Sequence, residues 1–189
     1  MIIFFDTETT GLPGKKWFSA SHYSHWPHLV EIAWIECKDD GTIITEFESI
    51  IKPDSFNIPK AASSIHGITT YIAQQNGRTA GVVLKQFCES LENCSFIVGH
   101  NVEFDINVIT SEAFRLEICI PIRLHPIKCT MKSSVNMCKI KRCGGYKSPT
   151  LSELHTFLFG TPPHAVHRAL ADARTCMKCY FEMKQRGKF

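Results

Sequence analysis

Two acidic side chains stand two residues apart near the N-terminus, directly after a run of large apolar residues. The run Ile2–Phe5 is typical of a buried β-strand, and Asp6 and Glu8 follow it. Because side chains alternate along a strand, both carboxylates are expected on one face of a sheet, where each raises the pKa of the other unless a cation lies between them. Taken alone, such a pair is more often a solvated strand end than a metal site. Here the tripeptide Thr9–Gly11 follows directly, and its glycine lets backbone approach a ligand closely.

Asp105 is another candidate acid, and it also follows an apolar run. Phe96–Gly99 has the composition of a short buried strand, and Asn101 is placed to cap the helix that follows, with Asp105 in its first turn. An acid in the first turn commonly does no more than complement the helix dipole. Taken alone, Asp105 fits that role better than a catalytic one.

His167 and Asp172 lie close to the start of the last predicted helix. Five residues on a regular helix correspond to about 140° of rotation, so the two side chains would not share a face. They can converge if His167 lies in the loop before the helix and Asp172 lies in its first turns, where three nearby alanines favour close approach to the sheet. The alternative for His167, one of nine histidines, is an ordinary surface position.

Together, the four acids have the chemistry of a divalent-cation site. Carboxylate oxygens suit Mg²⁺ or Mn²⁺, which retain several waters and accept a phosphate oxygen as a further ligand. Two such ions about 4 Å apart can stabilise both the attacking and the leaving oxygen of an in-line displacement at phosphorus. A neutral histidine beside them can accept the proton of the attacking water. The acids and His167 therefore indicate phosphodiester chemistry more strongly than any of them does alone.

Strands and helices are needed to bring these side chains together. Strands are expected at Ile2–Phe5, Leu29–Cys37, Thr42–Ile51, Phe96–Gly99 and Ile127–Thr130, with Asp39–Gly41 as a hairpin turn. Helical segments are expected at Pro59–Ile65, Thr69–Gln75, Thr79–Leu91, from Asn101 to about Leu116, at Leu151–Phe159 and at Ala169–Lys184. A meander of three strands followed by strands alternating with helices predicts an α/β domain with a mixed five-stranded sheet flanked by helices.

Two further segments are predicted to be loops. The segment 13–27 carries the basic and aromatic residues Lys15, Lys16, Trp17, His22, Tyr23, His25 and Trp26. The segment 139–148 contains glycine and the basic residues Lys139, Lys141, Arg142 and Lys147. These cations could bind backbone phosphates, and Trp17, Tyr23 and Trp26 could stack on unpaired bases. A solvated loop or ordinary packing explains both segments equally well.

Length and composition fit one globular domain over residues 1–189. Apolar residues make up 44%, apolar runs stay far below the roughly 20 residues needed to cross a bilayer, and no signal peptide is recognised at the N-terminus. A cytoplasmic location without membrane contact is expected, with the nine cysteines as free thiols. The pair Cys176 and Cys179, in a predicted helix, lacks the turn chemistry of a structural zinc site. A net charge of +3 neither requires nor opposes nucleic acid.

Three motifs resemble, in order, those of the DEDDh (DnaQ-like) 3′–5′ exonucleases, a family that includes the proofreading subunit of bacterial DNA polymerase III. They are Asp6-Thr7-Glu8-Thr9-Thr10-Gly11, His100-Asn101-Val102-Glu103-Phe104-Asp105 and His167-Arg168-Ala169-Leu170-Ala171-Asp172. Lesser segments that fit are Val30–Ala33, Lys52–Pro53 leading to Ile65–Ile68, and Thr150–Leu154. The match runs from residue 2 to about residue 180, and no catalytic position is substituted. The long 13–27 segment departs from the shorter form of this loop, which bears on how a substrate strand enters.

The resemblance implies a ribonuclease H-like fold and an enzyme that releases nucleoside 5′-monophosphates from 3′ ends. It implies that Asp6, Glu8 and Asp172 hold one Mg²⁺ or Mn²⁺ ion, that Asp6 bridges to a second ion, and that Asp105 supports the site largely through water. It implies His167 as the general base. The residues implied to hold the 3′-terminal nucleotide are Thr9, Gly11, Leu12, His66, Asn101 and Phe104.

A single-stranded or frayed 3′ end of DNA is the expected substrate, and a DNA polymerase is a candidate partner. Two alternatives stay open at the level of sequence. One is an RNA-directed exoribonuclease, because contacts to the 2′-OH cannot be read from the motifs. The other is a non-catalytic nucleic-acid- or polymerase-binding module of the same fold, since fold does not fix function. The intact acids and histidine argue against the second alternative.

Overall fold

The computed structural model describes residues 1–14, 18–164 and 167–189. Its centre is a mixed sheet with the strand order β3-β2-β1-β4-β5. The strands are β1 (Ile2–Thr9), β2 (Leu29–Cys37), β3 (Ile43–Ile50), β4 (Phe96–Gly99) and β5 (Ile127–Cys129). β2 is antiparallel to β1 and β3, whereas β1, β4 and β5 are parallel to one another. The carboxyl ends of these three parallel strands therefore lie at one edge of the sheet.

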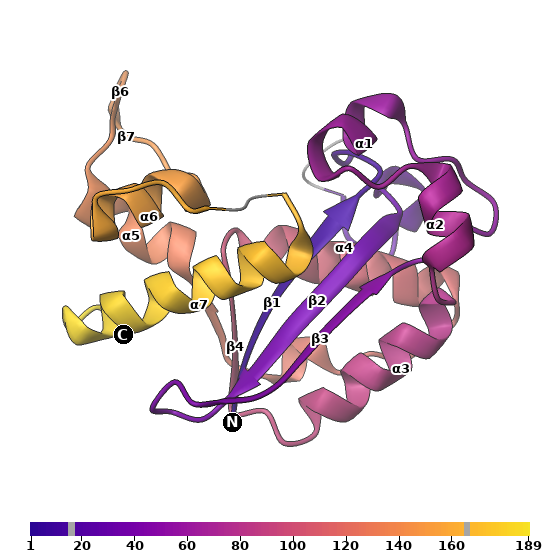
Figure 1. Ribbon diagram of the computed structural model, residues 1–189, viewed down its shortest axis with the longest axis horizontal. Coiled ribbons are helices and arrows are strands. Elements are labelled where there is room, and N and C mark those ends of the chain that lie inside the picture. Colours follow the sequence, from indigo (N-terminus) through magenta and orange to yellow (C-terminus); the bar gives the residue numbers. More distant parts are fainter. Residues whose placement is uncertain (15–17, 165–166) are drawn as a thin grey trace.

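Helices of very different length surround the sheet (Figure 1). They are α1 (Lys60–His66), α2 (Thr70–Asn76), α3 (Ala80–Leu91), α4 (Val102–Arg115), α5 (Thr130–Cys138), α6 (Leu151–Phe159) and α7 (Ala169–Gln185), with short 3-10 helices at Tyr23–His25 and Ile122–Leu124. Between α5 and α6 the chain forms a small hairpin of β6 (Lys141–Arg142) and β7 (Gly145–Tyr146). Of the helices described, none is both long and apolar enough to span a membrane.

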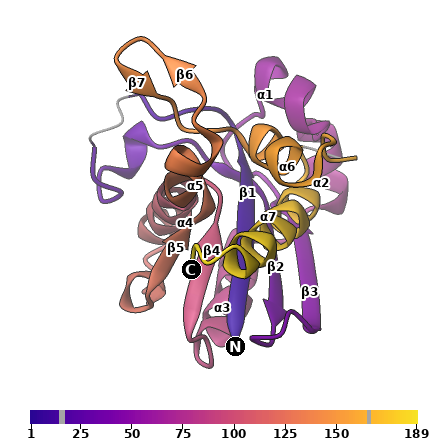
Figure 2. The same ribbon diagram turned by 90° about the vertical axis from the view of Figure 1, so that its left-hand side faces the viewer.

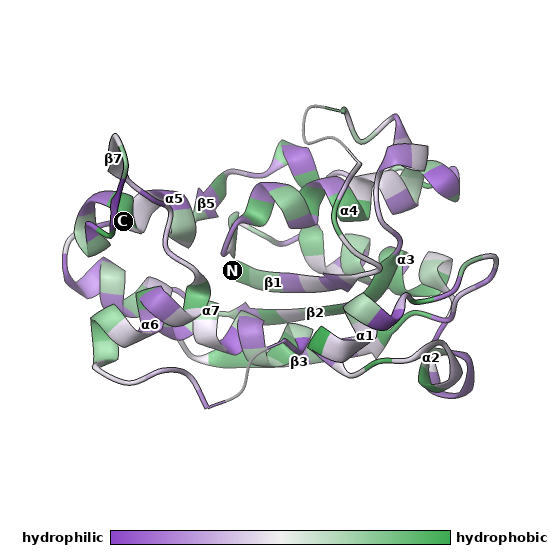
Figure 3. Ribbon diagram, turned by 90° about the horizontal axis from the view of Figure 1, so that it is seen from above, coloured by the Kyte–Doolittle hydropathy of each residue, from purple (hydrophilic) through white to green (hydrophobic). Residues whose placement is uncertain are grey.

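The layers explain why β1 begins as a run of apolar residues without alternation. Ile3 and Phe5 pack into the core that α3 and α4 form on one face of the sheet. Ile2 and Phe4 pack on the other face, against α7. Seen from above, the strands lie between a layer with α3 and α4 and a layer with α6 and α7 (Figure 3). Side-chain alternation therefore directs the even-numbered residues of β1 toward α7.

The expected α/β class and the mixed five-stranded sheet flanked by helices are confirmed. β2, β4 and α6 have the predicted bounds, and most other elements differ by one or two residues. β1 is longer than predicted, because its acidic end continues to pair with β2 as far as Thr9. α5 was not expected, and the segment 139–148 holds a short hairpin instead of being entirely loop.

Asn101 occupies the N-cap position of α4 as predicted, but its side chain does not cap the helix. Its backbone is left-handed, with φ 66°, and its exposed side chain makes no capping hydrogen bond. Its carbonyl accepts the N–H of Phe104 at 2.9 Å. Asparagine tolerates this conformation better than most residues, and such backbone strain is found most often at functional sites. The polar end of Asn101 is thus left available on the surface.

Candidate active site

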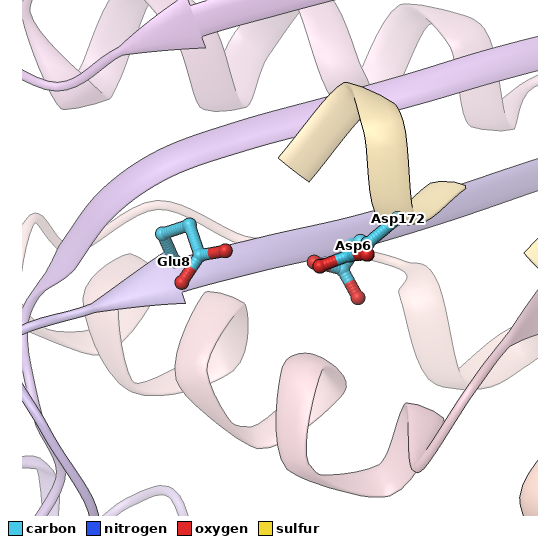
Figure 4. A group of neighbouring side chains, drawn as sticks. All are labelled: Asp6, Glu8 and Asp172. Carbon is cyan, nitrogen blue, oxygen red and sulfur yellow. The ribbon is translucent and has the colours of Figure 1, made fainter. Parts of the chain in front are cut away.

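Three carboxylates converge where the end of β1 meets the start of α7. Asp6 and Glu8 come from β1, and Asp172 comes from the first turn of α7. One ligand oxygen from each of the three lies within 4.8 Å of the others. Figure 4 shows the first two side chains on the strand, with Asp172 reaching it from the helix. These are the side chains that the sequence predicts to hold one metal ion.

The convergence follows from the packing beneath it. Asp6 and Glu8 continue the even-numbered row of β1 that faces α7. The first turns of α7 place Ala169 and Ala173 against the sheet, and both are fully buried. Because these side chains are small, the helix axis comes close to the strand. Asp172 can therefore reach the carboxylates with a short side chain.

Asp105 approaches from the opposite layer and is not one of the group of three. Its buried carboxylate accepts a hydrogen bond of 2.7 Å from the Thr7 hydroxyl, on the α4 side of β1. β4 pairs with β1 only as far as Phe4, so α4 begins beside the unpaired stretch of β1 that carries the acids. Gly99 makes this tight turn feasible, because a Cβ there would lie 2.8 Å from a methyl of Val102.

Burial and mutual repulsion make this a site of excess negative charge. Burial, followed by the charges of Asp105, Asp172 and Glu8, raises the pKa of Asp6 well above its usual range. Burial, and then the charges of Asp172 and Glu31, raises the pKa of Glu8 to about 8. The pKa values of Asp105 and Asp172 are also raised, in both cases mainly by burial. A divalent cation would relieve this repulsion, and the all-oxygen donor set suits Mg²⁺ or Mn²⁺.

His167 lies in the loop just before α7, as its spacing from Asp172 predicted. Its main-chain N–H donates to the Asp172 carboxylate at 2.9 Å, and its side chain is exposed. The residue has a left-handed backbone, with φ 64°. The carboxylate thus holds the loop in a conformation that non-glycine residues rarely adopt. The structure thereby ties the position of the histidine to an acid of the site.

Sequence reasoning missed an ion pair between a buried carboxylate and an exposed arginine, which fixes the start of α7. Glu31 on β2 is completely buried and lies opposite Glu8 in the register of the sheet. Its carboxylate accepts bonds from Arg168 Nε at 3.1 Å, from Arg168 Nη2 at 2.6 Å and from the Ala169 N–H at 2.9 Å. The two partners are 137 residues apart in the chain. The only sequence signal was that each lies inside a segment of the family resemblance.

The residues expected to hold a nucleotide lie around the acids on several elements. Thr9 ends β1, and its hydroxyl donates to the Gly11 carbonyl at 2.7 Å. Leu12, next along the chain, exposes 80% of its surface. Phe104 is half-buried in the first turn of α4 and packs near Trp26.

His66, at the end of α1, is more deeply buried than Thr9, the other buried member of the expected nucleotide-binding set. Its Nδ1 accepts the N–H of Ile68 at 3.1 Å, which assigns the proton of the neutral ring to Nε2. Among the described residues, Nε2 meets no partner in hydrogen-bonding geometry. Burial lowers the pKa of this histidine. The ring is therefore neutral and lies beside the backbone of Thr9, which partly opposes the effect of burial on its pKa.

The other residues singled out in the sequence fall into different roles. Trp26 is buried in the core and donates its Nε1–H to the Phe18 carbonyl, so it cannot stack on a base. Tyr23 is 44% exposed, whereas Lys15, Lys16 and Trp17 lie outside the described residues. Cys176 and Cys179 are buried in different apolar clusters. The metal-ligand group found in the described part of the chain consists of carboxylates.

The chain is similar in sequence to known proteins. The family model described as "Exonuclease" matches residues 3–180. The epsilon subunit of DNA polymerase III from Treponema pallidum (strain Nichols) is 30% identical over 186 residues, covering 95% of this chain and 74% of the relative.

Solved structures show the same fold at lower identity. The zinc-bound complex of E. coli exonuclease I with single-stranded DNA has a TM-score of 0.77 and 19% identity, covering 98% of this chain and 40% of the other. Exonuclease X in complex with 5′-overhanging duplex DNA has a TM-score of 0.63 and 24% identity, covering 99% and 93%. The family match over nearly the whole chain, together with the epsilon relative, shows that this protein belongs to the DnaQ-like family of 3′–5′ exonucleases, with their ribonuclease H-like fold.

Proposed function

We propose that this protein is a metal-dependent 3′–5′ exonuclease that removes nucleotides one at a time from a single-stranded or frayed 3′ end of DNA, releasing nucleoside 5′-monophosphates. The observation that carries this proposal is the convergence of the Asp6, Glu8 and Asp172 carboxylates within 4.8 Å of one another. Residues 1–189 are proposed to act as one exonuclease domain, and a cytoplasmic location remains a prediction from the sequence.

Asp6, Glu8 and Asp172 are the residues that would hold one Mg²⁺ or Mn²⁺ ion, with Asp6 bridging to a second. Bound divalent ions supply an activated water and stabilise the negative charge that develops on the phosphate oxygens. The raised pKa values of the acids support this assignment, since buried carboxylates without a cation hold their protons. The Thr7 hydroxyl keeps Asp105 on the other side of β1, where it supports the site largely through water.

His167 is the proposed general base. Its neutral imidazole would accept the proton of the attacking water. The bond between its main-chain N–H and Asp172 keeps the residue next to the acids without using either ring nitrogen. The exposure of the side chain leaves a route by which the proton can pass to solvent.

The proposed nucleotide site surrounds the acids and accounts for attack at a chain end. The exposed Leu12 side chain would pack on the terminal base, and the Thr9–Leu12 backbone would lie along the sugar and phosphate. The Nε2–H of His66 would donate to the nucleotide, as would the side chain of Asn101. Phe104 would contact the sugar or base from the α4 side.

DNA is the favoured substrate because of how the similar proteins are described. The epsilon relative is named as a subunit of a DNA polymerase, and the two structural neighbours are described with bound DNA. A DNA polymerase is accordingly proposed as a partner. Cleavage of RNA is the competing possibility, and discrimination would depend on contacts to the 2′-OH.

Digestion of end-labelled oligonucleotides tests the proposal directly. With Mg²⁺ or Mn²⁺, a 5′-labelled single strand should shorten through a ladder of products, and a 3′-labelled strand should release labelled mononucleotide in the first step. EDTA or Asp6→Ala should abolish both signals. A matched RNA strand, run in parallel, reports the sugar preference.

An Asp54→Asn variant is a matched control, because Asp54 is an exposed acid outside the group of three. It should digest DNA like the unmodified protein. Digestion that persists at full rate in EDTA or in Asp6→Ala would reject the mechanism. Release of label from the 5′ end first would reject the polarity.

A further inference from the structure

The basic side chains are distributed very unevenly along the chain. Residues 118–152 contain seven of the 21 Lys and Arg residues and none of the 18 Asp and Glu residues. The rest of the chain therefore carries 14 basic and 18 acidic side chains, a net negative charge. The small overall charge of +3 conceals one positive segment, which runs from the end of α4 to the start of α6.

Some cations of this segment are already engaged inside the protein. Arg123 pairs with Glu103, and Lys147 pairs with Glu153 at 2.5 Å. Lys128 donates to the Tyr180 hydroxyl and lies over the ring of Phe96. Within the described part of the chain, the ion pairs include none from Lys139, Lys141 or Arg142, all of which are exposed.

Two of these cations lie on the β6–β7 hairpin, and Lys139 lies just before it, at the end of α5. Lys141 and Arg142 form β6, opposite Tyr146 and Gly145 of β7, and Tyr146 is 47% exposed. The hairpin projects beyond α5 and α6 (Figure 1, Figure 2). A Cβ added at Gly144 or Gly145 would meet no atom within 4 Å, so the tip stands clear of the remaining structure.

The base of the hairpin is firmly attached to the edge of the sheet that carries the acids. The His100 ring lies 3.0 Å from both the Pro149 carbonyl and the Thr130 hydroxyl. His100 follows β4, and Thr130 follows β5, and both strands are parallel to β1. Since the carboxyl ends of parallel strands share one edge, the hairpin rises from the same edge as Asp6 and Glu8.

We propose that the β6–β7 hairpin binds the phosphate backbone of the nucleic-acid strand upstream of the 3′-terminal nucleotide. The inference rests on the proposed exonuclease function, because the acids fix where the 3′ end lies. Lys139, Lys141 and Arg142 would contact phosphates, and Tyr146 would stack on an unpaired base. The near absence of exposed apolar side chains on the hairpin favours a nucleic-acid strand over a protein partner.

Charge reversal on the hairpin tests the proposal. In Lys141→Glu/Arg142→Glu, kcat/KM for a 20-nucleotide single strand should fall at least about 5-fold relative to kcat/KM for a dinucleotide, which is too short to reach the hairpin. The decrease should arise mainly in KM. The slope of log(kcat/KM) against log salt should become shallower by about 1.4, as expected for two lost phosphate contacts on a single strand.

Lys38→Glu/Lys85→Glu is the matched control, with the same change of charge at two exposed lysines. Lys38 follows the end of β2 that pairs with the start of β1, far from the acids, and Lys85 lies on α3. In this variant, the ratio of kcat/KM for the 20-nucleotide strand to kcat/KM for the dinucleotide should stay unchanged. If this ratio were the same in the hairpin variant and in the control, the proposal would be overturned, provided that the unmodified protein digests both substrates. If the unmodified protein digested neither substrate, the exonuclease function itself would be rejected.

Thiol footprinting gives a readout that does not require a variant. Cys143 at the hairpin tip and Cys119 after α4 are both exposed, and the Cys119 carbonyl lies near Cys88 of α3. A phosphorothioate-protected oligonucleotide should slow maleimide modification of Cys143 at least about 3-fold and leave that of Cys119 unchanged. Equal rates at Cys143 with and without a saturating oligonucleotide would contradict the proposal.

Discussion

At the scale of single residues, the charge on Asp6 is the feature that most limits the stability of the metal-free site. Burial and four neighbouring acids all raise its pKa, so its ionised form is disfavoured in the folded state. Asp6→Asn keeps the size of the side chain and removes the charge. We expect this variant to melt roughly 3–6 °C higher than the unmodified protein in EDTA, which corresponds to about 1–2 kcal/mol for a chain of this size.

Calorimetry at pH 8.5 tests this expectation, since that pH lies above the value of about 8 to which the pKa of Glu8 is raised. Millimolar Mn²⁺ should raise the melting temperature of the unmodified protein but leave that of Asp6→Asn nearly unchanged. The exposed-acid variant Asp54→Asn should behave like the unmodified protein in both buffers. Equal metal-induced shifts in all three proteins would refute the assignment of Asp6 as a ligand.

The family resemblance implied that Asp6, Glu8 and Asp172 come together, but the sequence did not show what holds them. Asp6 and Glu8 follow a strand, and Asp172 begins a helix, so local rules place each of them. Glu31 and Arg168 are different, because each alone has an ordinary role at a strand or a helix terminus. Their pairing depends on a contact across 137 residues, which no local pattern encodes.

At the scale of elements, the Glu31–Arg168 pair makes the start of α7 a positioned part of the site. Glu31 is fully buried and also accepts the Ala169 N–H, whereas Arg168 is partly exposed. Arg168→Ala would leave the buried Glu31 carboxylate with too few donors, and a buried charge without its hydrogen-bond partners is costly. We expect the helix start to shift, moving Asp172 and His167 away from the acids on β1.

Two readouts separate this positioning role from a general loss of stability. The affinity for Mn²⁺ should fall about 10-fold or more, and kcat should fall while KM for a long oligonucleotide changes little; Arg168→Lys should restore part of both. Arg174→Ala is the matched control, because Arg174 of α7 also forms an ion pair with a residue of the sheet, Glu46, but this pair is more exposed to solvent. If Arg174→Ala lowered Mn²⁺ affinity to the same extent, Arg168 would have no special role.

Element prediction succeeded where the local signals agreed with the fold. α6 has a complete capping box between Thr150 and Glu153, and its bounds match the prediction. α5 was missed because its buried residues are Thr130 and Ser134, which give no apolar stripe, and because Cys129 makes no side-chain cap. The extension of β1 to Thr9 is stabilised by pairing with β2, a partner that the strand's own residues do not reveal.

At the scale of the whole molecule, one edge of the sheet gathers nearly everything that the proposed reaction needs. The parallel strands β1, β4 and β5 deliver the acids, the loop before α4 and the start of α5 to the same edge. His100 joins two of these parts to the hairpin, since it leads into Asn101 and lies within 3.0 Å of Thr130 and of the hairpin base at Pro149. Its protonation state therefore matters for the assembly of the edge as a whole.

Burial lowers the pKa of His100 to about 4 from an ordinary value of 6.5, against a smaller opposing effect of the Pro149 carbonyl. The folded state thus keeps the ring neutral, whereas the unfolded chain binds a proton below pH 6.5. The contribution of this residue to the free energy of unfolding is complete above pH 6.5 and is lost as the pH falls toward 4, by at most about 3 kcal/mol.

Urea unfolding at pH 7.0, 5.5 and 4.5 tests this expectation. As the pH falls, the free energy of unfolding should decrease more steeply in the unmodified protein than in His100→Gln, whose amide can still donate to Pro149 but does not titrate. The exposed His164→Gln should follow the unmodified protein at all three pH values. If the free energy of unfolding changed with pH in the same way in His100→Gln and in the unmodified protein, the loss of stability in acid would come from other groups. The neutral ring of His100 would then not link the hairpin to the sheet edge that carries the acids.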